Sequence, residues 1–146
     1  MATIYTIGYE GADPDRFRDT LAGAGIELVA DVRAVALSRK RGFSKNVLRA
    51  GLAEAGIGYR HWIDLGTPKA GREAARAGDA AGLRRVYGEQ LALPEAATAL
   101  DELAAAAAER STCLLCFERD PRFCHRRILA ERLAGRGFEA VDLSVV

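Results

Sequence analysis

Cysteine is scarce in this sequence, long apolar runs are absent, and neither sign of charge dominates. Three cysteines is an odd number, and a chain of 146 residues buries enough surface to fold without disulfide staples. We therefore expect free thiols and a reducing, cytoplasmic location. No apolar run reaches the ~20 residues that span a bilayer, and nothing at the start resembles a signal peptide, so no membrane partner is expected. A net charge of +1 gives no global argument for nucleic acid.

Five short apolar runs alternate with stretches in which apolar residues recur at helical spacing. Strands that alternate with helices pair in parallel, because each return crossing needs a covering helix. We expect a single three-layer α/β/α domain over residues 1–146, Rossmann-like, with a mainly parallel sheet of about five strands. Right-handed crossovers favour strand 1 in the centre, with strands 2 and 4 beside it. The expected strands are residues 3–7, 28–30, 57–59, 113–115 and 140–141, and the expected helix starts are Asp13-Pro14, Ser44, Asp79, Pro94 and Asp120-Pro121.

Polar residues follow these apolar runs immediately. Asp31 and Arg33 come directly after the second run, and Cys116 and Glu118 follow the fourth. In open parallel sheets, ligands bind outside the carboxyl ends of the strands. We therefore expect these four side chains and His125 to surround one concave surface. Arg33 is expected to make a charge-assisted contact with Asp31, with Glu118 or with a bound anion.

The densest group of chemically capable residues runs from Cys116 to Arg126. Cys116 ends a strand, whereas Cys124 and His125 stand at the start of the next helix, where free N–H groups lower the pKa of a thiol. The group is compatible with a thiolate nucleophile, a redox thiol pair, metal ligands or simple apolar packing of a cysteine. Cys116 and Arg122 have the spacing of a phosphatase loop, but two acids and a proline between them argue against it. No Cys-x2-Cys pair occurs, so no metal site is expected.

A cluster of cations follows the second strand. Residues 39–45, the basic loop, contain four cations and Phe43 but no acid. Cationic contacts to phosphates give affinity without sequence specificity, and an aromatic ring can stack on a base. The loop therefore indicates either a nucleic-acid contact or a solvated surface segment.

At these motifs the sequence resembles the family catalogued as domain of unknown function 488. The similarity rests on Thr6-Ile7-Gly8-Tyr9-Glu10, on Asp31-Val32-Arg33, and on Cys116-Phe117-Glu118 with Cys124-His125-Arg126. It extends over essentially the whole chain. The family implies a small single-domain α/β protein of bacteria and archaea, with motifs that suggest an enzyme and no established reaction. The positions that this resemblance marks are Gly8, Asp31, Arg33, Ser38, Cys116, Glu118, Cys124, His125 and Arg126.

Together these patterns favour an enzyme that acts on a nucleotide or another phosphorylated small molecule. Two alternatives remain: a nucleic-acid-binding module built on the basic loop, and a non-catalytic structural or partner-binding domain. The sequence requires no cofactor. Of the two cysteines near the expected helix start, Cys124 is expected to be the more reactive. The expected catalytic residues are Cys116, Glu118, Cys124 and His125, and the expected substrate- or anion-binding residues are Gly8, Tyr9, Asp31, Arg33, Ser38 and Arg126.

Overall fold

A five-stranded parallel sheet forms the centre of the protein. The computed structural model describes residues 2–145. The strands lie in the order β3-β2-β4-β1-β5, and every pairing is parallel. The prediction of a three-layer α/β/α domain with about five parallel strands is confirmed. The strands are β1 (Ala2–Gly8), β2 (Leu28–Asp31), β3 (Gly58–His61), β4 (Thr112–Cys116) and β5 (Phe138–Asp142).

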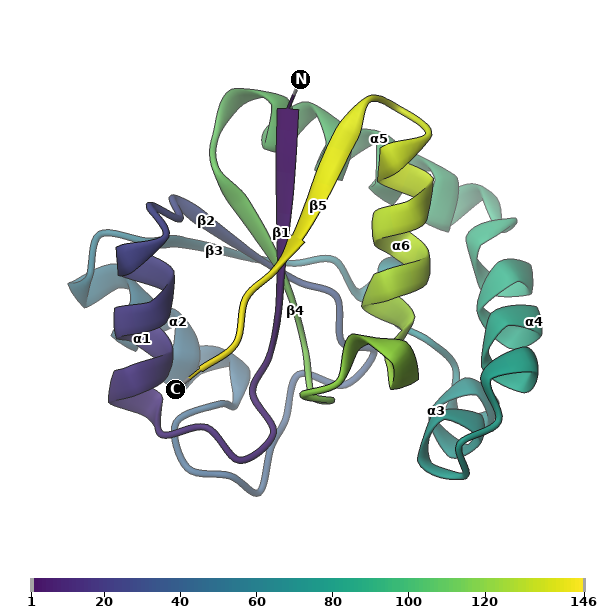
Figure 1. Ribbon diagram of the computed structural model, residues 1–146, viewed down its shortest axis with the longest axis horizontal. Coiled ribbons are helices and arrows are strands. Elements are labelled where there is room, and N and C mark those ends of the chain that lie inside the picture. The colour runs from purple at the N-terminus through teal and green to yellow at the C-terminus, as the bar shows by residue number, and fades with distance from the viewer. Residues whose placement is uncertain (1, 146) are drawn as a thin grey trace.

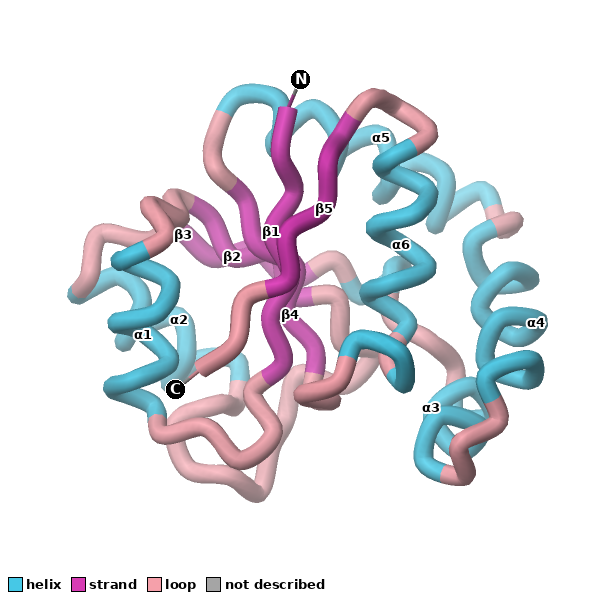
Figure 2. Tube along the Cα trace, viewed as in Figure 1, coloured by secondary structure: helices cyan, strands magenta, loops and turns pink. Residues whose placement is uncertain are grey.

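Helices cover both faces of this sheet (Figure 1). Each face has its own apolar core, because successive strand residues point to opposite sides. Val29 and Cys113 pack on the face under α1 and α2, whereas Ala30 and Leu114 pack under α4, α5 and α6. Figure 2 shows the strands enclosed between these two groups of helices. The helices are α1 (Pro14–Gly23), α2 (Lys45–Glu54), α3 (Lys69–Arg76), α4 (Ala80–Leu91), α5 (Pro94–Glu109) and α6 (His125–Ala134).

Most helix starts follow the local signals in the sequence. Asp13 caps α1 by accepting two backbone N–H bonds, and Pro14 takes the first helical position. Asp79 caps α4 in the same manner. Ser44 takes the N-cap position of α2, but its hydroxyl bonds to the backbone of Ser38 instead. That bond folds the segment between β2 and α2 back on itself.

The strand order differs from the expected one, because β4 and not β1 is central. β4 pairs with both β1 and β2, and β5 pairs with the other side of β1. All five residues of β4 are buried, as a strand covered on both faces requires, whereas β5 is exposed after Phe138. The helices that follow β1 and β4 lie on opposite faces of the sheet (Figure 1). This divergence opens a crevice at the carboxyl ends of the two strands.

Two helical segments also differ from the prediction. The helix α3 was not expected, because it is short and the residues that it turns toward the core, Gly71, Ala74 and Ala75, are small. The helix α6 begins at His125, later than expected, because Pro121–Phe123 form a 3-10 turn and Cys124 occupies the N-cap with extended backbone. None of the described helices is long and apolar enough to cross a membrane.

Candidate functional site

A pocket of about 320 Å³ lies where β1, β2 and β4 end. Tyr9 follows β1, Arg33 follows β2 and Cys116 ends β4, and all three line the pocket together with Glu118 and His125. Four of the five residues expected around one concave surface are therefore there. The fifth, the aspartate of β2, is fully buried and is not among the lining residues.

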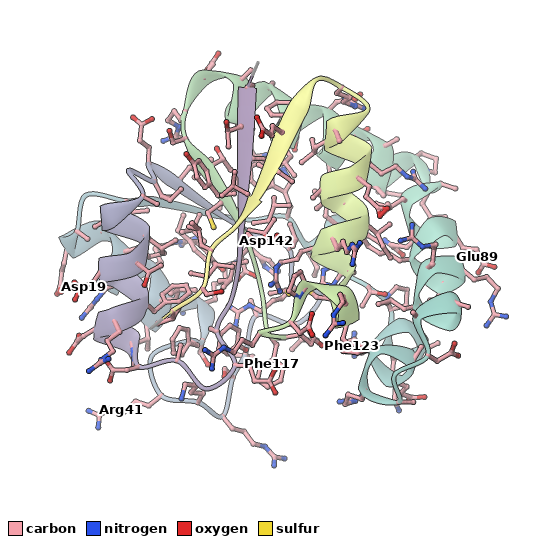
Figure 3. The ribbon with its side chains drawn as sticks, viewed as in Figure 1. Asp19, Arg41, Glu89, Phe117, Phe123 and Asp142 are labelled. Carbon is pink, nitrogen blue, oxygen red and sulfur yellow. A yellow bond between two sulfur atoms is a disulfide. The ribbon has the colours of Figure 1, made fainter. Side chains whose placement is uncertain are left out.

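The rim of this pocket is apolar. Val35, Leu37 and Phe117 line it and keep 51%, 73% and 45% of their surfaces exposed. Figure 3 shows Phe117 at the end of the sheet where the strands give way to loops. Apolar side chains at the mouth of a polar pocket suit a ligand that has both a charged part and a flat or apolar part.

Cys116 and Cys124 are joined by a disulfide bond. This corrects the expectation of three free thiols, because Cys113 alone is free. Cys113 is buried in the core under α1 and α2, where burial raises the pKa of its thiol, so it is unreactive. The late start of α6 explains the pairing: the 3-10 turn returns the chain to the end of β4 and leaves Cys124 as N-cap beside it.

Arg126 lies beside this disulfide and is wholly buried. Its Nη1 donates to Sγ of Cys116 at 2.9 Å and to the carbonyl of Glu118, and its Nη2 donates to the carbonyl of Arg119 at 3.3 Å. Its Nε has no partner, and none of the ion pairs within residues 2–145 includes Arg126. Burial lowers the pKa of Arg126. An unpaired buried charge of this kind is costly.

His125 is the first residue of α6 and is held in its neutral form. Its Nε2 lies 2.6 Å from the carbonyl of Val32, so this nitrogen carries the proton and donates it. Its Nδ1 lies 3.7 Å from Sγ of Cys124. Burial lowers the pKa of His125 to about 4. At neutral pH the ring therefore ties α6 to the end of β2 and carries no charge.

Glu118 is the acidic residue that lines the pocket among the described residues. Burial raises the pKa of its carboxyl group, and the charge of Arg126 opposes that change. A carboxyl group with a raised pKa in a cleft is a candidate general acid or base.

Arg33 forms the predicted charge-assisted contact, and its partner is Asp31. Its Nε and Nη2 donate to the two carboxylate oxygens at 2.8 and 2.7 Å. Its Nη1 donates to the carbonyl of Phe43 at 2.7 Å and to the hydroxyl of Tyr9 at 3.3 Å. Tyr59 donates a further hydrogen bond to Asp31. Most N–H groups of the Arg33 guanidinium are therefore hydrogen-bonded within the protein. Asp31 holds this guanidinium in place and does not itself line the pocket.

The basic loop does not present an aromatic ring to solvent. Phe43 is fully buried and stacks on Tyr9 with 4.6 Å between ring centroids, so it is not free to stack on a base. Arg39 lines the pocket, whereas Arg41 extends away from the molecule (Figure 3). Ser38, another expected binding residue, also lines the pocket, and its hydroxyl accepts a backbone N–H of the loop.

Three residues of the pocket that the sequence did not reveal come from α3 and its entry. Arg72 and Arg76 lie one turn apart on α3, and Thr67 precedes the helix. The hydroxyl of Thr67 is buried without a hydrogen-bond partner. The i, i+4 spacing of the two arginines is a signal that could have placed them on one helix face. With Arg33 and Arg39, they bring four arginines to a pocket that contains one carboxylate.

Gly8 supports the site from behind the pocket. It ends β1 opposite Cys116, and a Cβ atom there would lie 1.8 Å from the carbonyl oxygen of Glu118. A side chain would therefore displace the backbone that follows β4. Gly8 and Arg126, both expected to bind substrate or anion, are absent from the lining of the pocket.

A group of three side chains has the spacing of a metal site but not the chemistry. Cys116, Glu118 and Cys124 each place one possible ligand atom within 4.8 Å of the others. The two sulfurs are bonded to each other, so neither offers a thiolate. The guanidinium of Arg126 also lies against one of them and would repel a cation. The donor set therefore does not fit a metal ion.

The comparisons with known proteins identify a family. A family model described as "Domain of unknown function DUF488" matches residues 13–133. The chain belongs to the DUF488 family. The match includes the segments of Asp31 and Cys116 but leaves Gly8 outside it, and it confirms the resemblance found in the motifs. No curated protein and no solved structure matches this DUF488 protein.

Proposed function

We propose that this DUF488 protein is an enzyme that acts on a nucleotide or another phosphorylated small molecule. The observation that carries the proposal is a pocket of about 320 Å³ that combines four arginines with Cys116, Glu118 and His125. Its size suits a small molecule, and its positive lining favours phosphate groups. Its place at the carboxyl ends of the strands is where Rossmann-like sheets hold their ligands.

The anion-binding role belongs first to Arg39, Arg72 and Arg76. Arg33 lines the same pocket, but its donors are mostly used by the scaffold. Arg72 donates one bond at 2.9 Å to the carbonyl of Thr67 and retains further N–H groups. The Thr67 hydroxyl is buried against Gly71 without a partner, so the anion-binding assignment rests on the arginines.

The apolar rim supports a nucleotide over a simple phosphate. Phe117 and Leu37 stand exposed at the mouth of the pocket, on loops that follow β4 and β2. A base that stacks on an aromatic ring gains about 1–3 kcal/mol, whereas inorganic phosphate gains nothing there.

The chemical role belongs to Glu118 and Cys116. Glu118 is assigned as general acid or base, because its pKa is raised by burial and it lines the pocket. Cys116 is assigned as nucleophile once the disulfide is reduced, as the cytoplasmic location that we propose would allow. His125 positions the start of α6, because its Nε2 is committed and the pKa of its ring is about 4.

The nucleic-acid-binding alternative rests on charge alone. Its aromatic residue, Phe43, is buried, and Arg39 lines the pocket instead of an open surface. No observation favours this alternative over the small-molecule enzyme.

A ligand screen tests the proposal. Thermal unfolding is measured with nucleotides, sugar phosphates and inorganic phosphate, since a ligand that binds only the folded state raises Tm. We expect saturable stabilisation by a nucleotide or sugar phosphate and an affinity about ten-fold weaker in Arg72→Gln and in Arg76→Gln. Arg85→Gln, an exposed arginine of α4, is the matched control and should bind as the unchanged protein does. Absence of any saturable ligand, or equal losses in the control, contradicts the proposal.

A further inference from the structure

The buried charge of Arg126 makes no direct ion pair within residues 2–145, and the carboxylates of Asp142, Glu118 and Asp120 act on it without touching it. Its guanidinium contacts two backbone carbonyls and a sulfur atom, and its Nε contacts no acceptor. The contacted group that is able to become an anion is Cys116, whose Sγ lies 2.9 Å from Nη1. In the disulfide this sulfur is neutral, whereas in the reduced protein it can ionise and pair with the guanidinium.

We propose that Cys116 and Cys124 are a working dithiol–disulfide pair that exchanges with anionic low-molecular-weight disulfides, and that Arg126 holds Cys116 as a thiolate in the reduced protein. This activity goes beyond the proposed function and does not depend on which phosphorylated ligand the pocket takes. It rests on the disulfide, on the contact between Arg126 and Cys116, and on the place of Cys116 in the lining of the pocket.

The two sulfurs have different surroundings, which assign their roles. Cys116 lines the pocket, so it meets an incoming disulfide. Cys124 is the N-cap of α6 and accepts the backbone N–H of Arg126 at 3.4 Å. It lines a separate pocket between α4 and α6, away from the arginines that would bind an anionic disulfide. Cys116 is therefore the attacking thiol and Cys124 the resolving thiol. This order reverses the sequence-based expectation that Cys124 reacts faster.

The proposed thiol–disulfide exchange takes place in two steps. The Cys116 thiolate attacks one sulfur of a disulfide RSSR, which forms a Cys116–S–S–R bond and releases RS⁻. The released RS⁻ takes the proton of Cys124, and the new Cys124 thiolate attacks the Cys116 sulfur and expels a second RS⁻. The protein is oxidised by two electrons to its disulfide, and RSSR becomes one RSH and one RS⁻. An excess of the same thiol drives both steps in reverse.

The charge of the pocket selects the class of disulfide. Arg39, Arg72 and Arg76 line it together with Arg33, against the single carboxylate of Glu118. Oxidised glutathione carries carboxylates, bis(2-hydroxyethyl) disulfide is neutral, and cystamine is cationic. Each rate of oxidation of the reduced protein, measured by mass spectrometry, is divided by the rate of the same reagent with 2-mercaptoethanol, a thiol that carries no other charge. We expect oxidised glutathione to exceed the neutral reagent by about ten-fold and cystamine to be slowest. Equal rates, or a faster reaction of cystamine, overturn the assignment to anionic disulfides.

Single-cysteine variants test the order of attack. In Cys124→Ser, oxidised glutathione should form a stable mixed disulfide at Cys116, because no resolving thiol remains. In Cys116→Ser, modification of Cys124 should be about ten-fold slower. Faster modification of Cys124 than of Cys116, or no modification of Cys116 below the unfolding transition, overturns the proposal.

The pH dependence of alkylation tests the role of Arg126. Two charged groups face the sulfur of Cys116: the guanidinium of Arg126 favours its ionisation, and the carboxyl group of Glu118, within 4.8 Å, opposes it. Because the guanidinium is in direct contact, the rate of Cys116 alkylation in Cys124→Ser should have its midpoint at least about one pH unit below the ~8.5 of a free thiol. Arg126→Met in that background should raise the midpoint by about one pH unit, whereas Arg132→Met, an exposed arginine of the same helix, should leave it unchanged. A midpoint at or above ~8.5 in Cys124→Ser overturns the proposal by itself, even if Arg126→Met does not fold.

Discussion

Two arginines of this protein are almost fully buried, and their charges are met in different ways. Arg33 forms a bidentate ion pair with Asp31, and its remaining hydrogen bonds go to a backbone carbonyl and a tyrosine hydroxyl. Arg126 has carbonyls and a sulfur but no carboxylate. The charge of Arg33 is thus directly paired, whereas that of Arg126 gains an anion in direct contact when Cys116 ionises. At the residue scale, we therefore assign Arg33 a structural role and Arg126 a role in the proposed reaction of Cys116.

Removal of the Arg33 fork should destabilise the fold strongly. Arg33→Met leaves the carboxylate of Asp31 buried without its counter-charge, so we expect a loss of about 3–5 kcal/mol in the free energy of unfolding. Urea denaturation measures the loss. Arg84→Met, which breaks the exposed pair with Glu131, should cost less than about 1 kcal/mol. Similar losses in the two variants would show that the Arg33 pair is no stronger than a surface pair.

His125 should make the fold sensitive to acid. The pKa of His125 is about 4 in the folded protein and 6.5 for an ordinary histidine. Between these two pH values the unfolded chain is protonated at His125, whereas the folded protein is not. Above pH ~6.5 the contribution is fully present, and it is lost as the pH falls toward 4, by up to about 3 kcal/mol. The measurement is the free energy of unfolding at several pH values for the protein and for His125→Gln. The difference between the two should shrink on acidification, and a constant difference would contradict the assigned burial.

At the scale of elements, the end of β1 and the segment after β4 are in direct contact. Tyr9 and Glu10 donate backbone hydrogen bonds to the carbonyls of Cys116 and Phe117, at 3.2 and 2.8 Å. Gly8 allows this approach, because any side chain there meets the backbone of Glu118. This close contact fixes the positions of Cys116 and Glu118 relative to the end of β1.

Gly8→Ala should therefore disturb both stability and the site. The added Cβ meets a carbonyl oxygen of the backbone, so we expect a loss of at least about 2 kcal/mol and weakened ligand binding. Gly23→Ala is the matched control, since a Cβ there meets nothing within 4 Å and the residue lies in α1. That control should be neutral or stabilising by about 0.5–1 kcal/mol. Thermal denaturation of both variants, with and without ligand, separates the two effects.

At the scale of the whole molecule, stability should decrease from the centre of the sheet outward. β4 is paired on both sides and buried throughout, whereas α3 packs on α4 and buries only Gly71. Hydrogen exchange followed by mass spectrometry should show the slowest amides in β4 and exchange about a hundred-fold faster in α3. A ligand held by Arg72 and Arg76 should slow exchange in α3 without a change in β4. Protection of α3 equal to that of β4 in the free protein would contradict this gradient.

The sequence predicted the elements of the fold better than their arrangement. Asp13-Pro14 and Asp79 mark helix starts through chemistry that is local to a few residues, so they could be recognised. The central place of β4 depends on which strands fill the gap between β1 and β2, a matter of global packing. The helix α3 was missed because its core-facing residues, Gly71, Ala74 and Ala75, are small and give a weak apolar signal.

The same limit applies to the candidate site. The strand ends indicated Cys116, Glu118 and Arg33, because parallel strands all end on one side. The sequence did not show that the donors of Arg33 would be used in its ion pair with Asp31, nor that Cys124 would form a disulfide with Cys116. Both contacts depend on how the side chains pack in the folded protein.

The shallow burial of α3 has a consequence for how this protein can diversify. The reactive groups stand on the sheet and on α6, where most substitutions damage the core, whereas Arg72 and Arg76 stand on a helix that packs mainly on α4. Substitution of the exposed positions of α3, with Gly71, Ala74 and Ala75 kept, would change the lining of the pocket at little cost to the free energy of folding. If the proposed activity holds, libraries randomised at these exposed positions are a direct route to new selectivities with the sheet and α6 unchanged.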